Sequence, residues 1–224
     1  MKICVVTPYF QENIEWLLQA HASVKSQTTE ARHILVCDGA APAGIPDFQG
    51  THIVLQRNYR DYGNTPRLIG CYNAITAHDA DAIAFLDADN WYYPDHLSYL
   101  THIARQAQLM AVSSARMLHR LDGTPMIKCP TVDGENYVDT SCIVVFRPAF
   151  RFLISWALQG QDVAGQETDQ FLWRTIRDAG APVAFIDRPS VAYRTRHRVH
   201  YEQANEAAPP GAIVRRDVHG DRYQ

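Results

Sequence analysis

Lysine is nearly missing from this chain of 224 residues, in which three lysines stand beside 18 arginines. Arginine binds phosphate and carboxylate groups through paired hydrogen bonds that lysine cannot form, but biased codon usage explains most of such an excess. Net charge is also scarce, at −3 from 21 basic and 24 acidic residues. Since sequence-independent binding of nucleic acid needs many cationic phosphate contacts, we do not expect a nucleic-acid partner.

Long hydrophobic runs and paired cysteines are lacking as well. The first apolar run is four residues long and ends at Thr7-Pro8, which is too short for a signal-peptide core or a membrane span. The five cysteines include no Cys-x-x-Cys pair and sit in apolar runs, which indicates reduced, buried thiols rather than a zinc site. We therefore expect a cytoplasmic protein without a transmembrane segment, with at most peripheral membrane contact.

Apolar runs alternate with helical patterns in the first half of the chain. Asn13 is placed to cap a helix over Ile14–Ser26, and a second helix opens at Pro66, a residue suited to a first turn. Short, nearly continuous apolar strands between helices are typical of an α/β fold with a parallel sheet covered on both faces. The strands predicted in this half are Ile3–Thr7, His33–Cys37, His52–Gln56 and Ala82–Leu86.

The second half predicts a different mixture of elements. Its expected helices are Asp95–Gln106, Phe150–Leu158 and Glu167–Ala179, its strands are Met110–Leu118, Tyr137–Phe146 and Val183–Ile186, and Asp122-Gly123 is a hairpin turn. The length suits one domain over 1–200. Residues 201–224 are expected to form a loosely ordered tail or an arm of a homodimer.

Polar residues follow three of the predicted strands, at Thr7-Pro8-Tyr9, at Asp38-Gly39 and at Asp87-Ala88-Asp89. Ligands of parallel α/β sheets bind beyond the carboxyl ends of the strands, so we expect the site there. In extended chain, Asp87 and Asp89 point the same way and can face one Mg²⁺ or Mn²⁺ ion. Two carboxylates are too few for a protein-only cage, which implies that a diphosphate ligand supplies further oxygens. An Asp-rich turn without a ligand, or an enzyme that forms an aspartyl-phosphate, are the alternatives.

Several stretches occur together in an order that resembles family 2 glycosyltransferases with the GT-A fold. They are Val5-Val6-Thr7-Pro8-Tyr9-Phe10, Ser23-Val24-Lys25-Ser26-Gln27-Thr28, Ile34-Leu35-Val36-Cys37-Asp38-Gly39, Phe85-Leu86-Asp87-Ala88-Asp89-Asn90-Trp91, Glu167-Thr168-Asp169-Gln170 and Tyr193-Arg194-Thr195-Arg196-His197. The resemblance covers about residues 3–200. Two positions depart from the family pattern, because Cys37 replaces the first Asp of an Asp-Asp pair and Thr168 replaces the Glu before Asp169.

The resemblance implies a mostly parallel, Rossmann-like central sheet flanked by helices, with a smaller sheet on the acceptor side. It also implies that the domain over 1–200 divides into a nucleotide-binding half at 1–110 and an acceptor half at 111–200. It also implies an inverting, metal-dependent transfer of a sugar from a nucleotide-diphosphate donor to a hydroxyl of a glycan, lipid or protein acceptor. The implied site residues are Asp169 as catalytic base; Pro8, Tyr9, Asp38, Arg67, Asp87, Asp89 and Arg194 for the nucleotide sugar; and Asp89, Asp87 and His197 for Mn²⁺ or Mg²⁺.

Each of these roles has a plainer alternative. Tyr9 can pack in the core instead of stacking on a base, His197 can be a loop histidine, and Asp169 can simply complement a helix dipole. Arginines such as Arg67 are more often structural than catalytic. For the whole chain, the alternatives are a nucleotidyltransferase, which normally has a Gly-rich loop that is lacking after Pro8, and a non-catalytic nucleotide-sugar-binding protein.

Overall fold

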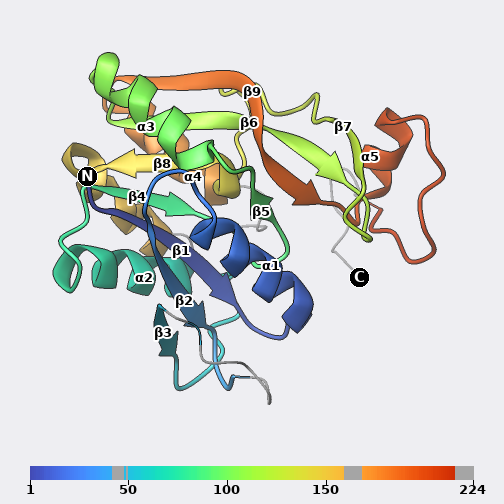
Figure 1. Ribbon diagram of the computed structural model, residues 1–224, viewed down its shortest axis with the longest axis horizontal. Coiled ribbons are helices and arrows are strands. Elements are labelled where there is room, and N and C mark those ends of the chain that lie inside the picture. The colour runs from blue at the N-terminus through green and yellow to red at the C-terminus, as the bar shows by residue number, and fades with distance from the viewer. Residues whose placement is uncertain (42–47, 49, 159–167, 215–224) are drawn as a thin grey trace.

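The computed structural model describes residues 1–41, 48, 50–158 and 168–214 (Figure 1). The expected β-strand and helix alternation is present throughout the first half. In chain order the elements are β1 (Ile3–Tyr9), α1 (Ile14–Lys25), β2 (Arg32–Cys37), β3 (Thr51–Val54), α2 (Asn64–Thr76), β4 (Ala82–Phe85), β5 (Trp91–Tyr92), α3 (His96–Gln106), β6 (Ala111–His119), β7 (Pro125–Lys128), the 3₁₀ helix η1 (Thr140–Cys142), β8 (Ile143–Phe146), the 3₁₀ helix η2 (Arg147–Ala157), α4 (Thr168–Asp178), β9 (Val183–Arg194) and α5 (Arg198–Gln203).

The central sheet has the strand order β3-β2-β1-β4-β8-β6-β9-β5, with β7 paired to β6. Strands β3, β2, β1 and β4 are parallel to one another, whereas β8 runs antiparallel to both of its neighbours. The first four strands therefore end at one common edge. The predicted parallel sheet of the first half is confirmed.

Helices cover both faces of this sheet. On one face α2, η2 and α4 pack against alternate strand residues, and Trp156 and Trp173 are almost fully buried there. On the other face α1 and α3 cover the remaining strand residues, with Leu97 and Leu100 fully buried. Alternation of side chains along a strand explains why nearly every residue of β1 is apolar, since each face meets a helix layer.

Two long strands carry the sheet into a smaller second part. β6 pairs with β8 over Ala111–Ser113, and it pairs with β7 at Met117 and His119, beyond irregular register near Ala115. β9 follows β6 along its whole length, and its Val191 and Ala192 also pair with β5 on the other edge of the strand. The ends of β6 and β9 lie with β7 and α5 on the side away from α2 (Figure 1). The smaller sheet is thus an extension of the central one.

Three predictions for the second half differ from the structure. Of the strand expected over Tyr137–Phe146 only Ile143–Phe146 is extended, because Asp139 caps the short η1 helix through a hydrogen bond from the Ser141 N–H. The segment expected as an α-helix over Phe150–Leu158 is the 3₁₀ helix η2, and the strand expected over Val183–Ile186 continues to Arg194.

Residues 201–214 lie against the rest of the molecule. Glu206 forms an ion pair with Arg120 at 2.5 Å, and Ile213 forms a β-bridge with His197. Residues 215–224 of the predicted tail lie outside the described part, and a domain boundary at residue 200 stays a prediction. Within residues 1–41, 48, 50–158 and 168–214, no helix has the length and apolar character needed to cross a bilayer.

Candidate functional site

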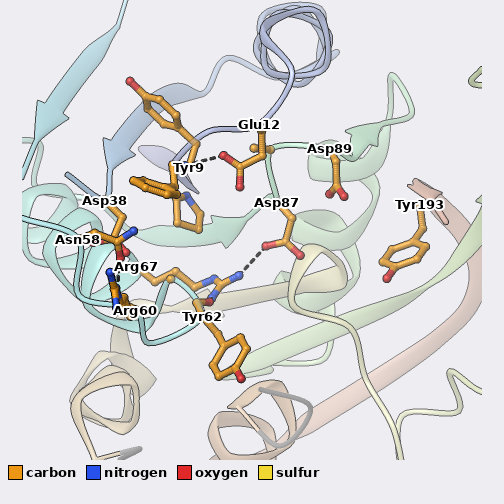
Figure 2. Close-up of a pocket in the computed structure, with 14 residues that line it drawn as sticks. Tyr9, Glu12, Asp38, Asn58, Arg60, Tyr62, Arg67, Asp87, Asp89 and Tyr193 are labelled. Atoms are coloured by element: carbon orange, nitrogen blue, oxygen red, sulfur yellow. Dashed lines mark hydrogen bonds and ion pairs between the residues drawn. The ribbon is translucent and has the colours of Figure 1, made fainter. Parts of the chain in front are cut away.

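A pocket of about 420 Å³ lies where β1, β2 and β4 end (Figure 2). Its position is the one expected for a ligand site in a parallel α/β sheet. It brings together six of the predicted site residues, which arrive from three strands and the start of α2. The lining residues are Pro8, Tyr9, Phe10, Glu12, Asp38, Asn58, Arg60, Tyr62, Gly63, Arg67, Asp87, Ala88, Asp89 and Tyr193.

The carboxylates of Asp87 and Asp89 form one wall of this pocket. They follow β4 on a turn that the Asn90 N–H closes by donating to the Asp87 carbonyl oxygen at 3.1 Å. Burial, followed by the charges of Asp87 and Glu12, raises the pKa of Asp89 to about 7. A positive charge placed beside Asp89 would therefore favour the ionised form of its carboxyl group.

Arg67 occupies the centre of the pocket floor. Its Nη2 forms an ion pair with Asp87 Oδ1 at 2.6 Å, and its Nη1 donates to the Tyr62 carbonyl oxygen at 2.8 Å. The guanidinium also lies over the Trp156 ring, 5.2 Å from its centre. Only 8% of the Arg67 side chain is exposed, against 28% for Asp87. The sequence left open whether Arg67 is structural or binds a ligand, and this geometry allows both.

Asp38 and Asn58 lie at the other end of the pocket, away from Asp89 in Figure 2, and Pro8 also lines the pocket. The Asp38 N–H donates to the Tyr9 carbonyl oxygen at 2.7 Å, and Asp38 Oδ1 accepts the Tyr59 N–H at 3.0 Å. Burial raises the pKa of Asp38. A fixed acceptor beside a proline suits recognition of a flat heterocycle with N–H groups.

The Tyr9 side chain is buried rather than open to a stacking ligand. It is 3% exposed, and its hydroxyl lies 2.5 Å from Nε2 of His52, with which the Tyr9 ring is stacked. Leu17 and Phe48 belong to the same apolar cluster. The sequence left open whether Tyr9 stacks on a base or packs in the core, and these contacts are those of a core residue.

Arg194 lies behind the pocket and is not one of its lining residues. Its Nη1 donates to the Asp89 carbonyl oxygen at 2.7 Å, its Nε to the Leu121 carbonyl oxygen at 3.1 Å, and its Nη2 to Gln19 Oε1 at 2.7 Å. All three nitrogen atoms therefore have protein acceptors. The predicted phosphate contact of Arg194 is not assembled in this arrangement, since the guanidinium serves the backbone of the Asp89 turn.

His197 does not join the two aspartates. It precedes α5, and its ring meets the edge of the His200 ring at a centroid distance of 5.5 Å. Among the described residues, no three His, Cys, Asp or Glu side chains come together as potential metal ligands. The predicted set of Asp87, Asp89 and His197 is thus not formed here, and a ligand role for His197 stays a prediction.

Asp169 is the second residue of α4 (Thr168–Asp178). The side chain of Asp169 and the residue Glu167, which precedes α4, lie outside the part of the chain that the structure describes. α4 ends before Gly180, whose φ of 69° lies in the left-handed region favoured by glycine, as the sequence predicts. The catalytic role of Asp169 stays a prediction.

The family model described as "Glycosyl transferase family 2" matches residues 4–166, which include β1, β4 and the carboxylate turn. The chain belongs to glycosyl transferase family 2. This family 2 chain is also 36% identical over 103 residues to the succinoglycan biosynthesis protein ExoW of Rhizobium meliloti (strain 1021). That match covers 43% of the chain and 32% of ExoW, so the chain spans about a third of the length of this relative.

Crystal structures of S. aureus TarS have the same fold. For TarS 1-349 the TM-score is 0.63 at 15% sequence identity, over 90% of this chain and 63% of the other. A structure of TarS 1-349 in complex with UDP-GlcNAc gives a TM-score of 0.63 at 13% identity, over 88% and 59% of the two chains. The GT-A fold, expected from the sequence, is confirmed by these likenesses.

The side chains at this end of the pocket fit a hard divalent cation that a bound diphosphate would coordinate as well. Asp87 and Asp89 offer carboxylate oxygens, which Mg²⁺ and Mn²⁺ prefer. Burial, followed by the neighbouring negative charges, raises the pKa of Asp89, and the positive charge of a bound cation would oppose both effects. The protein offers too few ligands here to enclose the ion alone.

The sequence did not indicate several lining residues, namely Phe10, Glu12, Asn58, Arg60, Tyr62 and Gly63. Glu12 Oε2 accepts the Phe10 N–H at 2.5 Å, directly after the end of β1. Arg60, Tyr62 and Gly63 all have positive φ angles, of 56°, 58° and 81°. Only Gly63 adopts such an angle without strain, so residue types alone gave no signal for the path of this loop.

Proposed function

We propose that the chain is an inverting, metal-dependent glycosyltransferase, which moves a sugar from a nucleoside-diphosphate donor to an acceptor hydroxyl. The proposal rests on one observation, the convergence of Asp38, Arg67, Asp87 and Asp89 in a single pocket at the carboxyl edge of a family 2 fold. Its volume of about 420 Å³ lies in the range of sites for small molecules. The proposed acceptor is a hydroxyl group of a glycan, a lipid or a protein.

The two ends of the pocket suit the two ends of such a donor. Pro8 and Asp38 would hold the nucleobase, and Arg67 would bind the diphosphate, which its planar guanidinium can grip with two N–H groups. S. aureus TarS forms complexes with UDP and with UDP-GlcNAc. We therefore propose a UDP-sugar as the first donor to test.

Mn²⁺ or Mg²⁺ would be held by Asp89 and Asp87, with His197 as the proposed third ligand. When bound, such an ion stabilises negative charge on the departing nucleoside diphosphate. Arg67 adds a fixed positive charge at the same place, because its ion pair with Asp87 orients the guanidinium into the pocket.

Asp169 would be the general base that takes the proton of the acceptor hydroxyl while its oxygen attacks C1 of the sugar. Attack from the face opposite the diphosphate inverts the anomeric centre. Asp87 and Asp89 would remain with the leaving group, so acid–base chemistry and leaving-group stabilisation belong to different carboxylates. We also propose a cytoplasmic location and a homodimer formed through the C-terminal segment.

The experiment is to compare the wild type with Asp169→Asn and Asp178→Asn, two changes at opposite ends of α4. Release of UDP from UDP-GlcNAc is measured with Mn²⁺, with and without a mixture of acceptor sugars, together with binding of UDP. The proposal expects Asp169→Asn alone to abolish turnover while UDP binding persists. If Asp169→Asn turns over the donor as the wild type does, the assignment of the base is wrong. If the wild type and both variants bind UDP but none of them releases UDP from UDP-GlcNAc, the result favours the alternative of a non-catalytic nucleotide-sugar-binding protein.

A further inference from the structure

A buried hydrogen-bond network lies beneath the turn that carries Asp87 and Asp89. Its centre is Asn90, which is 1% exposed and does not line the pocket. Asn90 Nδ2 donates to Ser141 Oγ at 3.1 Å, and Asn90 Oδ1 accepts the Arg194 N–H at 3.0 Å. Since a backbone N–H can only donate, it fixes which end of the Asn90 amide faces β9 and which faces η1.

Ser141 extends the network to the first carboxylate of the turn. Its Oγ also accepts the Asp87 N–H at 3.1 Å, and its own N–H donates to Asp139 Oδ1 at 3.0 Å. Asp139 is in turn ion-paired with Arg116, and both side chains are almost fully buried. The backbone of Ser141 is therefore tied to the buried Arg116–Asp139 pair, which places the Ser141 hydroxyl beneath the turn.

Arg194 extends the network to the second carboxylate of the turn. Its backbone N–H binds Asn90, while its guanidinium donates to the Asp89 carbonyl oxygen at 2.7 Å and lies between the Trp16 and Trp91 rings. The backbone is thus fixed at the N–H of Asp87 and at the carbonyl of Asp89. Asn90 is the only described side chain that bonds both to Ser141 and to the backbone of Arg194.

We propose that Asn90 is a positioning residue, which holds the backbone of the turn so that the carboxylates of Asp87 and Asp89 face one cation and the donor diphosphate together. The inference rests on the proposed function. Two neighbouring carboxylates repel each other, so a turn without this anchor relaxes towards separation of Asp87 and Asp89. Small displacements of groups that hold a charged ligand cost much of its binding.

The test uses Asn90→Ala, Ser141→Ala and the double variant, with Thr101→Ala as control. Thr101 is also buried, but its hydroxyl donates only to backbone oxygens of α3, away from the pocket. The probe is UDP, titrated by calorimetry at a series of Mn²⁺ concentrations, and thermal unfolding is recorded for each variant. The Mn²⁺ concentration for half-maximal UDP binding separates positioning of the carboxylates from a merely structural role.

We expect Asn90→Ala to raise this Mn²⁺ concentration by about tenfold or more, the size of a lost buried hydrogen-bond network. The double variant should be no worse than Asn90→Ala by more than about twofold, because the two residues act as one unit. An unchanged Mn²⁺ requirement in a folded Asn90→Ala, or an equal shift in Thr101→Ala, overturns the inference. If Asn90→Ala does not fold, the same criteria apply to Ser141→Ala. If the wild type binds no nucleotide with Mn²⁺, the proposed function itself fails instead.

Discussion

Replacement of Arg67 by methionine removes a guanidinium that serves both the fold and the proposed site. The change breaks the ion pair with Asp87 at 2.6 Å and the hydrogen bond to the Tyr62 carbonyl oxygen at 2.8 Å. Methionine keeps a long apolar stem against Trp156, so the loss of packing stays small. The expected effect is therefore mainly electrostatic.

The size of that effect follows from the exposure of the two partners. Breaking a fully buried ion pair by removing one partner costs about 3–5 kcal/mol. Asp87 keeps 28% of its side chain exposed, so water replaces part of the lost interaction. We expect Arg67→Met to lower the free energy of unfolding by about 1–3 kcal/mol. We also expect it to weaken binding of UDP with Mn²⁺ by about tenfold to a hundredfold, since one charge-assisted contact to the diphosphate is lost.

Urea unfolding, followed by tryptophan fluorescence, and calorimetry with UDP and Mn²⁺ measure the two effects. Arg147→Met is the matched control, because Arg147 pairs with Asp79 and Asp81 at the surface and its side chain is 47% exposed. The control should change stability by no more than about 0.5 kcal/mol and leave UDP binding unchanged. Equal stability and equal UDP affinity of Arg67→Met and wild type would refute the role given to Arg67.

Three further outcomes are expected. Gly70→Ala places a Cβ 2.4 Å from Val6 Cγ1, so α2 must move away from β1. The free energy of unfolding should decrease by about 1–3 kcal/mol, seen as a lower urea midpoint, and an unchanged midpoint would contradict the close packing. Burial lowers the pKa of His96 to about 3. Below about pH 6.5 the unfolded chain therefore binds a proton that the folded chain does not, and the free energy of unfolding decreases by up to about 1.4 kcal/mol for each unit by which the pH is lowered. His96→Gln should therefore lose less stability than the wild type between about pH 7 and about pH 5 in urea titrations, and equal losses would count against it. Gly63→Ala puts an alanine at a φ of 81° and a Cβ 3.2 Å from Arg67 Nη1. It should reduce the free energy of UDP binding, measured by calorimetry, by more than the loss of folding stability that its melting temperature indicates. An unchanged affinity for UDP would contradict the role of this loop.

The first half of the fold could be predicted because its strands are short apolar runs with clear ends. Pro8, Asp38 and Asp87 each follow such a run, and in a parallel sheet those ends meet at one edge. The helix cap was equally local, since Asn13 Oδ1 accepts the Glu15 N–H at 2.8 Å. Local signals thus determined both the sheet and the place of the pocket.

The second half was harder because its signals are not local. The apolar run predicted a strand over Val183–Ile186, yet β9 continues to Arg194 through irregular pairing with Ala115 of β6. The segment before Ile143 has the composition of a strand, but Asp139 is fixed by its ion pair with Arg116 and bends the chain into η1. Such pairings depend on contacts far apart in the sequence.

The candidate site shows the same division. The carboxylates of Asp87 and Asp89 were predicted from a motif at a strand end, and the structure places them in the pocket. The role of Arg194 at the diphosphate was implied by the family resemblance and stays a prediction, and in the structure its guanidinium donates to the backbone carbonyl oxygens of Asp89 and Leu121. Residue type and spacing indicate that a group is near a site, whereas its hydrogen-bond partners decide which way it faces.

Calorimetric titration of the chain with UDP, GDP and dTDP, each with and without Mn²⁺, tests the central claim most directly. The account predicts that at least one of these nucleotides binds, that Mn²⁺ strengthens the binding, and that Asp89→Ala removes the effect of Mn²⁺. The absence of binding by all three nucleotides in the presence of Mn²⁺ would contradict a nucleotide-sugar site between Asp38 and Asp89.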